Sequence, residues 1–189
     1  MSETLILVDE NDRFLGTEEK MKVHIEGLLH RAFSVMIFNS KGQLLVQKRA
    51  KSKYHSAKLW ANSCCGHPRL NEDNMKAAQR RLQEELGFTC KLIKITELSY
   101  SLELQDGLYE REYTHIFAGI YDGDLELNPD EISEIKWKTP NDLRKKSISK
   151  PEQYARWFNL YLTEYYREIF KNNALLSLIN NTYNTPSSL

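Results

Sequence analysis

One amphipathic helix set among strand-like segments is the feature that most constrains this fold. Four apolar residues recur at spacings of three and four positions, as on the buried face of a helix: Met75, Ala78, Leu82 and Leu86. Asn71 is expected to cap its N-terminus and Gly87 to end it. Glu72 and Asp73 would then lie in the first turn, where acidic side chains favour the helix dipole. This helix needs a sheet to cover its apolar face.

Strand-like segments lie on both sides of the helix. Before it they span residues 5–8, 31–38, 43–47 and 59–65, and after it residues 92–104 and 108–121. Turn signals at 39–42 and 105–107 predict two hairpins, and Pro68 must end the segment before the helix.

The C-terminal part reads differently. Residues 151–170 are predicted to form one long amphipathic helix entered through Pro151, and residues 171–189 a polar, frayed tail. Strands around one helix, closed by a second, predict an α+β fold, an α/β/α sandwich in which helices flank a mixed sheet. We expect one domain over residues 1–189.

Composition excludes several classes of protein. The 26 basic and 26 acidic residues give a formal net charge of zero, which argues against a nucleic-acid binder. The apolar runs are too short to span a bilayer, so no membrane association is expected. The chain has an odd number of cysteines, of which two are adjacent, and this is a poor framework for disulfides: Cys64, Cys65 and Cys90. We therefore expect a cytoplasmic protein, and a monomer.

Two carboxylates suggest a metal site. Glu110 and Glu112 lie two apart in a predicted strand, so they leave one face of the sheet while His115 leaves the other. Paired carboxylates suit a divalent cation, although a solvated strand face gives the same pattern. Three histidines near strand starts or in loops offer further ligands: His24, His30 and His67.

The helix carries a second pattern. The run from Gly66 through Glu72 to the segment 80–88 resembles the Nudix box in its spacing. Nudix hydrolases place a metal-binding glutamate where this chain has Arg81. That replacement argues against pyrophosphate hydrolysis, and an arginine suits a diphosphate oxygen instead.

The two remaining glutamates of the box differ in position. At about 100° per residue, Glu85 lies at the edge of the apolar stripe and Glu84 points away from it. Glu85 is therefore the better metal ligand. The alternative is a plain surface pair between Arg81 and Glu85.

The segment Trp60-Ala-Asn-Ser-Cys-Cys-Gly-His-Pro68 narrows the family. It resembles the signature of type 1 isopentenyl-diphosphate delta-isomerases, as do His24, His30 before Arg-Ala-Phe-Ser, and Glu110-Arg-Glu112. The resemblance implies conversion of isopentenyl diphosphate to dimethylallyl diphosphate in isoprenoid biosynthesis. That reaction protonates an alkene and removes a proton from the neighbouring carbon, so it needs one acid and one base.

The resemblance also implies roles for particular residues. Cys65 and Glu112 would transfer the protons, with Tyr100 hydrogen-bonded near the acid. Strand alternation turns Cys64 away, and we expect both it and Cys90 to be small buried residues. The implied ligands of a Zn, Mn or Mg ion are His24, His30, His67, Glu110 and Glu112. A second cation, Mg, would bridge Glu85 and the substrate diphosphate.

The substrate has two chemically different ends. By the same resemblance, four cations would bind the diphosphate: Lys20, Arg49, Lys53 and Arg81. Trp157 would cover the hydrocarbon end, where its ring can stabilise a developing cation. Lys51, Lys58 and Arg69 are expected to be solvated.

Two other functions compete with the isomerase. One is a Nudix hydrolase of a diphosphate substrate. The other is a binding module in which His24, His30, His67 and Cys65 hold a structural zinc, so that chelation would unfold it.

Overall fold

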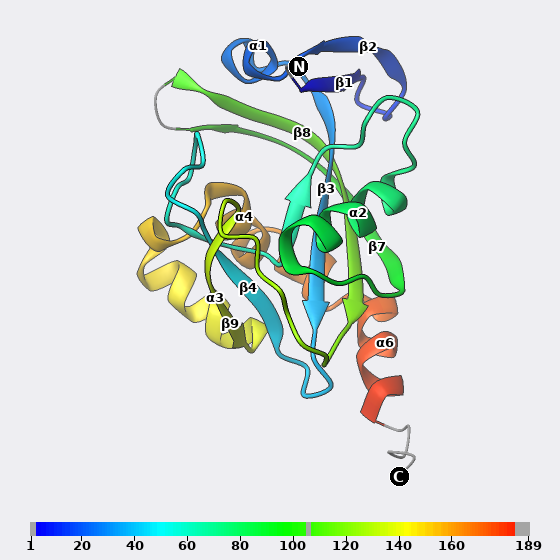
Figure 1. The fold of residues 1–189 in the computed structure, drawn as a ribbon, viewed down its shortest axis with the longest axis vertical. Coiled ribbons are helices and arrows are strands. Elements are labelled where there is room, and N and C mark those ends of the chain that lie inside the picture. The colour runs from blue at the N-terminus through cyan, green and yellow to red at the C-terminus, as the bar shows by residue number, and fades with distance from the viewer. Residues whose placement is uncertain (1–2, 105–106, 184–189) are drawn as a thin grey trace.

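The structure is a computed structural model and describes residues 3–104 and 107–183 (Figure 1). Within them the strands are β1 Thr4–Val8, β2 Phe14–Glu19, β3 His30–Phe38, β4 Leu44–Arg49, β5 Trp60–Ala61, β6 Cys64–Gly66, β7 Leu92–Glu103, β8 Tyr109–Ile120 and β9 Ile132–Lys138. The helices are α1 Lys20–Glu26, α2 Asn74–Leu86, α3 Pro140–Ser149, the 3-10 turn Pro151–Gln153, α4 Arg156–Thr163, α5 Tyr166–Phe170 and α6 Asn173–Tyr183.

All of these strands belong to one mixed sheet. At its centre β3 runs parallel to β8, from His30 opposite Glu112 to Phe38 opposite Ile120. The long hairpin β7–β8 is antiparallel and β6 pairs with the other edge of β3. This pairing places β6 and β8 on either side of β3.

Two apolar cores cover the two faces of the sheet. Alternate residues of β3 face opposite ways, so Val35 packs with Leu82 of α2 and Met36 packs with Phe158 of α4. The helices that follow β9 cover the second face, to which β7 and β8 also contribute buried residues. The predicted α+β sandwich is confirmed.

The N-terminus of α2 differs from the prediction. Asp73 is the N-cap, because its carboxylate accepts hydrogen bonds from the backbone N–H groups of Met75 and Lys76. Asn71 instead lies in a left-handed turn with φ of 63°. The carboxylate of Glu72 binds Arg80 instead of lying in the first turn. Gly87 ends the helix as predicted.

The prediction of a single helix over residues 151–170 is wrong. Tyr154 and Ala155 are extended, because Tyr154 bridges to Trp60 and the Ala155 N–H donates to the Trp60 carbonyl at 2.9 Å. Pairing with β5 therefore stops the helix. The predicted tail is helical over Asn173–Tyr183, where Leu175 is buried. Residues 184–189 lie outside the described residues.

The two predicted hairpins fare differently. The hairpin β7–β8 is confirmed, with pairing from Leu92 opposite Gly119 to Glu103 opposite Tyr109. Residues 105 and 106 of its predicted turn lie outside the described residues. The strands β3 and β4 pair at Phe38 and Leu44, next to the predicted turn, where the Asn39 N–H donates to the Gln43 carbonyl at 3.0 Å. Their pairing stops there because β4 pairs with β5 from Gln47 onward, while β9 pairs along its other edge. No sequence pattern predicted β2, β9, α1 or α3.

No helix in the described part of the chain is long and apolar enough to cross a membrane.

Candidate active site

A pocket of about 720 Å³ lies where the N-terminal segment, the loop after β4, β6, α2 and β8 meet. Its lining brings together most of the predicted site residues. They are Lys20, His24, Arg49, Lys53, Cys65, His67, Arg81, Glu85, Glu110, Glu112 and Trp157. His30 and Tyr100 adjoin it through Glu112.

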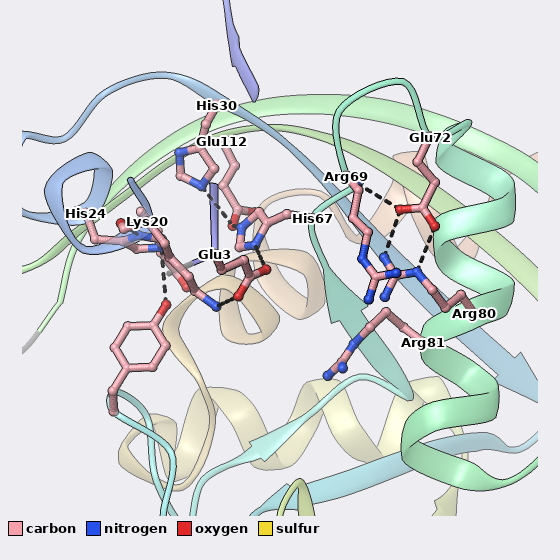
Figure 2. A network of polar contacts seen from close by, with 12 residues as sticks. Glu3, Lys20, His24, His30, His67, Arg69, Glu72, Arg80, Arg81 and Glu112 are labelled. Atoms are coloured by element: carbon pink, nitrogen blue, oxygen red, sulfur yellow. Dashed lines mark hydrogen bonds and ion pairs between the residues drawn. The ribbon is translucent and has the colours of Figure 1, made fainter. Parts of the chain in front are cut away.

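Three histidines from different elements converge at one end of this pocket (Figure 2). His24 comes from α1, His30 from the start of β3, and His67 follows β6. One ligand atom from each lies within 4.8 Å of the others. Such a group has the donor chemistry of a divalent-metal site.

Hydrogen bonds set the ring orientation of two of them. The Nδ1–H of His24 donates to the Lys20 carbonyl at 2.8 Å, and that of His30 donates to the Leu28 carbonyl at 2.9 Å. A carbonyl can only accept, so each Nε2 keeps its lone pair. Among the described residues, the buried Nε2 atoms of His30 and His67 have no hydrogen-bond partner. These nitrogens fit a metal ion as ligands.

Burial keeps the imidazoles of His30 and His67 uncharged. Desolvation lowers the pKa of His30 to about 3 and that of His67 to about 3. Neutral imidazole is the form that binds a metal.

The carboxylates of Glu110 and Glu112 leave one face of β8, as predicted. The Oε1 atom of Glu112 lies 3.8 Å from His30 Nε2 and 3.6 Å from His67 Nε2. Two ligand atoms that each lie about 2.0–2.2 Å from one ion are separated from each other by distances similar to those between Glu112 and the two histidines. Burial, and then the charge of Glu112, raises the pKa of Glu110 well above its usual range. His115 lies on the opposite face, as predicted. Its Nε2 is 3.0 Å from Asp12 Oδ2.

A chain of hydroxyl groups supports Glu112 from behind. The Tyr100 hydroxyl donates to Glu112 Oε2 at 2.5 Å and lies 3.2 Å from the Tyr161 hydroxyl. That hydroxyl in turn is 3.2 Å from Ser34 Oγ. The Tyr161 side chain is fully buried in the core, and this contact places its hydroxyl behind the carboxylate.

The two neighbouring cysteines face opposite sides of the sheet. Cys64 is fully buried in the core beneath α2, whereas Cys65 lines the pocket. Burial raises the pKa of the Cys65 thiol to about 12. Cys65 is therefore protonated at neutral pH and can donate a proton. Cys90 is only partly buried, so its predicted burial is incomplete.

Glu85 and Glu84 also divide as predicted. Glu85 is buried, and its carboxylate accepts from Arg81 at 2.5 Å and from Gln47 at 2.9 Å. Glu84 is partly exposed and contacts Arg80 and Arg81. Lys51, Lys58 and Arg69 are exposed as expected, although Arg69 reaches the pocket rim.

The predicted diphosphate-binding residues already have anionic or carbonyl partners. Lys20 pairs with Glu3 at 2.7 Å, and Lys53 pairs with Glu131 at 2.6 Å. The Arg49 guanidinium donates to the His55 carbonyl at 3.2 Å.

Trp157 lies between that guanidinium and a buried amide. The Arg49 guanidinium lies 5.2 Å from the centre of the Trp157 ring, and the Trp157 Nε1–H donates to Asn62 Oδ1 at 3.1 Å. The indole is therefore fixed in orientation at the pocket wall.

Sequence reasoning missed several residues of the pocket. They include Glu3, Gln47, His55 and Glu131. His55 Nε2 lies 3.7 Å from Glu110 Oε1, and the ring contacts Trp157 edge-on. His55 belongs to none of the motifs found in the sequence. No spacing rule links Glu131 to Lys53, because the two residues are far apart in the sequence.

The buried histidines predict that metal-free protein loses stability in acid. Because the folded-state pKa values of His30 and His67 are about 3 instead of 6.5, unfolding takes up protons between these values. The free energy of unfolding should fall as pH decreases through this window, by about 1.4 kcal/mol per pH unit for each histidine. Urea unfolding at pH 7 and pH 5 tests this. Equal free energies at the two pH values would contradict it.

Comparison with known proteins identifies the family. The NUDIX domain family matches residues 28–158. A protein of Serratia proteamaculans named isopentenyl-diphosphate Delta-isomerase is 48% identical over 158 residues, covering 84% of this chain and 88% of its own. One of Pectobacterium atrosepticum with the same name is 45% identical over 156 residues, covering 82% and 87%. This chain belongs to the isopentenyl-diphosphate Delta-isomerase family.

Solved structures show the same fold. The DR0079 protein of Deinococcus radiodurans superposes with a TM-score of 0.68 at 21% identity, covering 96% of this chain and 99% of its own. A MutT protein of Methanosarcina mazei Go1 gives a TM-score of 0.61 at 19% identity, covering 74% and 94%. The mixed sheet and its flanking helices are thus a Nudix fold.

Membership of this isomerase family confirms the resemblance seen at residues 60–68 and makes the chain an isomerase. Nudix domains generally use a divalent metal, and the cluster of His24, His30 and His67 is able to hold one.

Proposed function

We propose that this chain converts isopentenyl diphosphate to dimethylallyl diphosphate, with Cys65 and Glu112 transferring the protons. The observation that carries the proposal is that a protonated thiol and a carboxylate line one pocket, reached from β6 and β8 on either side of β3. This arrangement offers two proton-transfer groups from opposite sides of a bound substrate.

The reaction moves a double bond without changing the composition of the substrate. One group adds a proton to the terminal carbon of the alkene, and the other removes a proton from the carbon next to the phosphorylated one. The tertiary carbon between them carries the developing positive charge. Because the reaction is reversible, Cys65 and Glu112 exchange roles with direction.

Two aromatic groups support these steps. Tyr100 donates to Glu112 Oε2 and holds that carboxylate in the pocket. The indole of Trp157 faces the same pocket, where its ring would stabilise a cation by about 0.5–2 kcal/mol. Water must be excluded from such a cation.

The metal residues fit a divalent ion, Mn, Zn or Mg. The ligands would be His24, His30, His67, Glu110 and Glu112. Glu112 would be oriented and kept in its ionised form by the positive charge of such an ion. The orphaned Nε2 atoms of His30 and His67 and the unpaired Oε2 of Glu110 support this set among the described residues.

The diphosphate would bind at the other end of the pocket. Its charge-assisted partners would be Lys20, Arg49, Lys53 and Arg81, and Glu85 would help to hold the Mg that accompanies it. All five side chains line the pocket.

Neither competing function fits as well. A hydrolase would need a carboxylate where Arg81 reaches Glu85. A structural zinc held by three histidines and Cys65 would need the thiol within the histidine cluster. Beside the cluster of His24, His30 and His67, the place of a further ligand is taken by the Glu112 carboxylate, 3.8 Å from His30 Nε2 and 3.6 Å from His67 Nε2.

Incubation with isopentenyl diphosphate and Mg in deuterated water tests the function directly. Proton NMR should show dimethylallyl diphosphate forming with deuterium incorporated, because each turnover adds a solvent-derived proton. Release of phosphate without a new alkene would instead indicate hydrolysis. If neither the product nor exchange appears, the isomerase assignment is wrong.

A further inference from the structure

Basic and acidic side chains line the pocket in equal numbers. Six lysine or arginine side chains and six glutamates line it. A diphosphate carries several negative charges, and Lys20, Lys53 and Arg81 are already paired with carboxylates, so its binding must displace some of these ion pairs. The ion pairs of the predicted diphosphate-binding lysines and arginines therefore influence which form of the diphosphate the pocket accepts.

Glu131 forms ion pairs with two of these cationic side chains and so links them. Its Oε2 accepts from Lys53 Nζ at 2.6 Å, and its Oε1 lies 3.1 Å from Arg81 Nη2. Lys53 lies in the loop after β4 and Arg81 lies in α2. One carboxylate thus bridges two elements, with an oxygen on each cation, as two oxygens of a phosphoryl group would.

The backbone holds Glu131 in this position. Its N–H donates to the Asn128 carbonyl at 3.1 Å, and its carbonyl accepts from the Ala50 N–H at 2.9 Å. Burial alone would raise the pKa of Glu131, but Lys53 and Arg81 hold it below its usual range. Glu131 is therefore an anion fixed beside the cations.

A second carboxylate meets the same nitrogen of Arg81. Arg81 Nη2 lies 2.5 Å from Glu85 Oε1 and 3.1 Å from Glu131 Oε1. A diphosphate that takes over Lys53 and Arg81 leaves both carboxylates without their cations. Unpaired carboxylates in a partly desolvated pocket are costly, unless a divalent cation arrives with the diphosphate.

We propose that Glu131 is a specificity-determining residue that makes the pocket reject free diphosphate and accept diphosphate complexed with a divalent cation. It competes with the diphosphate for Lys53 and Arg81. The cation that arrives with the diphosphate offsets the negative charge of the carboxylates that lose these partners. The proposal rests on the proposed function only in taking a diphosphate as the ligand.

Calorimetric binding of inorganic pyrophosphate, with and without Mg, tests the proposal on the full chain. For the wild type, Mg should tighten binding. Glu131→Gln should bind pyrophosphate without Mg at least about tenfold more tightly than the wild type, because Lys53 and Arg81 lose their competing anion. Mg should then tighten its binding less than it does for the wild type.

Matched variants separate charge from packing. Glu131→Asp keeps the anion and should retain the Mg requirement, whereas Glu131→Ala should behave as Glu131→Gln does. Glu134→Gln is the control, because Glu134 pairs with Lys136 at 2.7 Å and lies outside the set of residues that line the pocket. It should bind as the wild type does. Thermal unfolding shows which variants are folded.

The proposal is wrong if both neutral variants bind Mg-free pyrophosphate no more tightly than the wild type. Weaker binding in both conditions would equally overturn it, since Glu131 would then only hold its cations in place. Isomerisation is scored separately by NMR. A negative NMR result with a relaxed Mg requirement in Glu131→Gln would reject the proposed function and leave this inference standing.

Discussion

Replacing Cys65 with alanine is expected to reduce isomerisation of isopentenyl diphosphate by about 10³-fold, within the range that general acid catalysis contributes. The thiol lines the pocket, and burial keeps it protonated, with a pKa of about 12. Alanine removes the transferable proton while leaving the β6 backbone paired with β3. The measurement is the rate of dimethylallyl diphosphate formation, together with deuterium incorporation.

Cys90→Ala is the matched control for this variant. Cys90 is also a free, partly buried thiol, but it packs on the α2 face of the sheet. Its loss should leave turnover within about twofold of the wild type, as expected for a side chain away from the site. Near wild-type turnover by Cys65→Ala at equal metal content would show that this thiol is not one of the proton-transfer groups.

Glu112→Gln should cause a loss of similar size, about 10³-fold, because an amide cannot take up and return the proton. The amide keeps the shape of the side chain and can still accept from Tyr100, which contacts Glu112 Oε2 at 2.5 Å. Glu112 is also a proposed metal ligand, so metal content must be measured beside turnover. The rate is then compared at matched metal loading.

Glu97→Gln provides the control on the same hairpin. Glu97 lies on β7 and contacts Tyr113 and His115, away from the residues that line the pocket. It should retain wild-type turnover. If Glu112→Gln regains full activity once its metal is restored, Glu112 acts only as a ligand and another group transfers the proton.

Local periodicity explains the parts of the fold that the sequence predicted. The spacing of Leu82 and Leu86 identified α2, and strand alternation separated Cys64 from Cys65 and His115 from Glu112. These features depend on neighbours within a few positions.

Features set by distant contacts were not predictable in this way. The break before α4 arises because Ala155 donates to Trp60, a partner on another element. The end of β3 that carries His30 and the loop that carries Glu131 are likewise placed by tertiary pairing. Sequence motifs identified the residues that resemble the family, and they gave no signal for His55 or Glu131.

The parallel pairing of β3 with β8 has a consequence for how the site is assembled. His30 stands opposite Glu112 in this pairing, and no tight turn joins the two strands. A slip by one residue would turn Glu112 to the face that now holds His115 and take Glu110 with it. Catalytic activity therefore depends on the alignment of two strands that are far apart in the sequence, since β3 ends at Phe38 and β8 begins at Tyr109. A variant that folds with misaligned strands would retain its secondary structure and lose both proton transfer and metal affinity together.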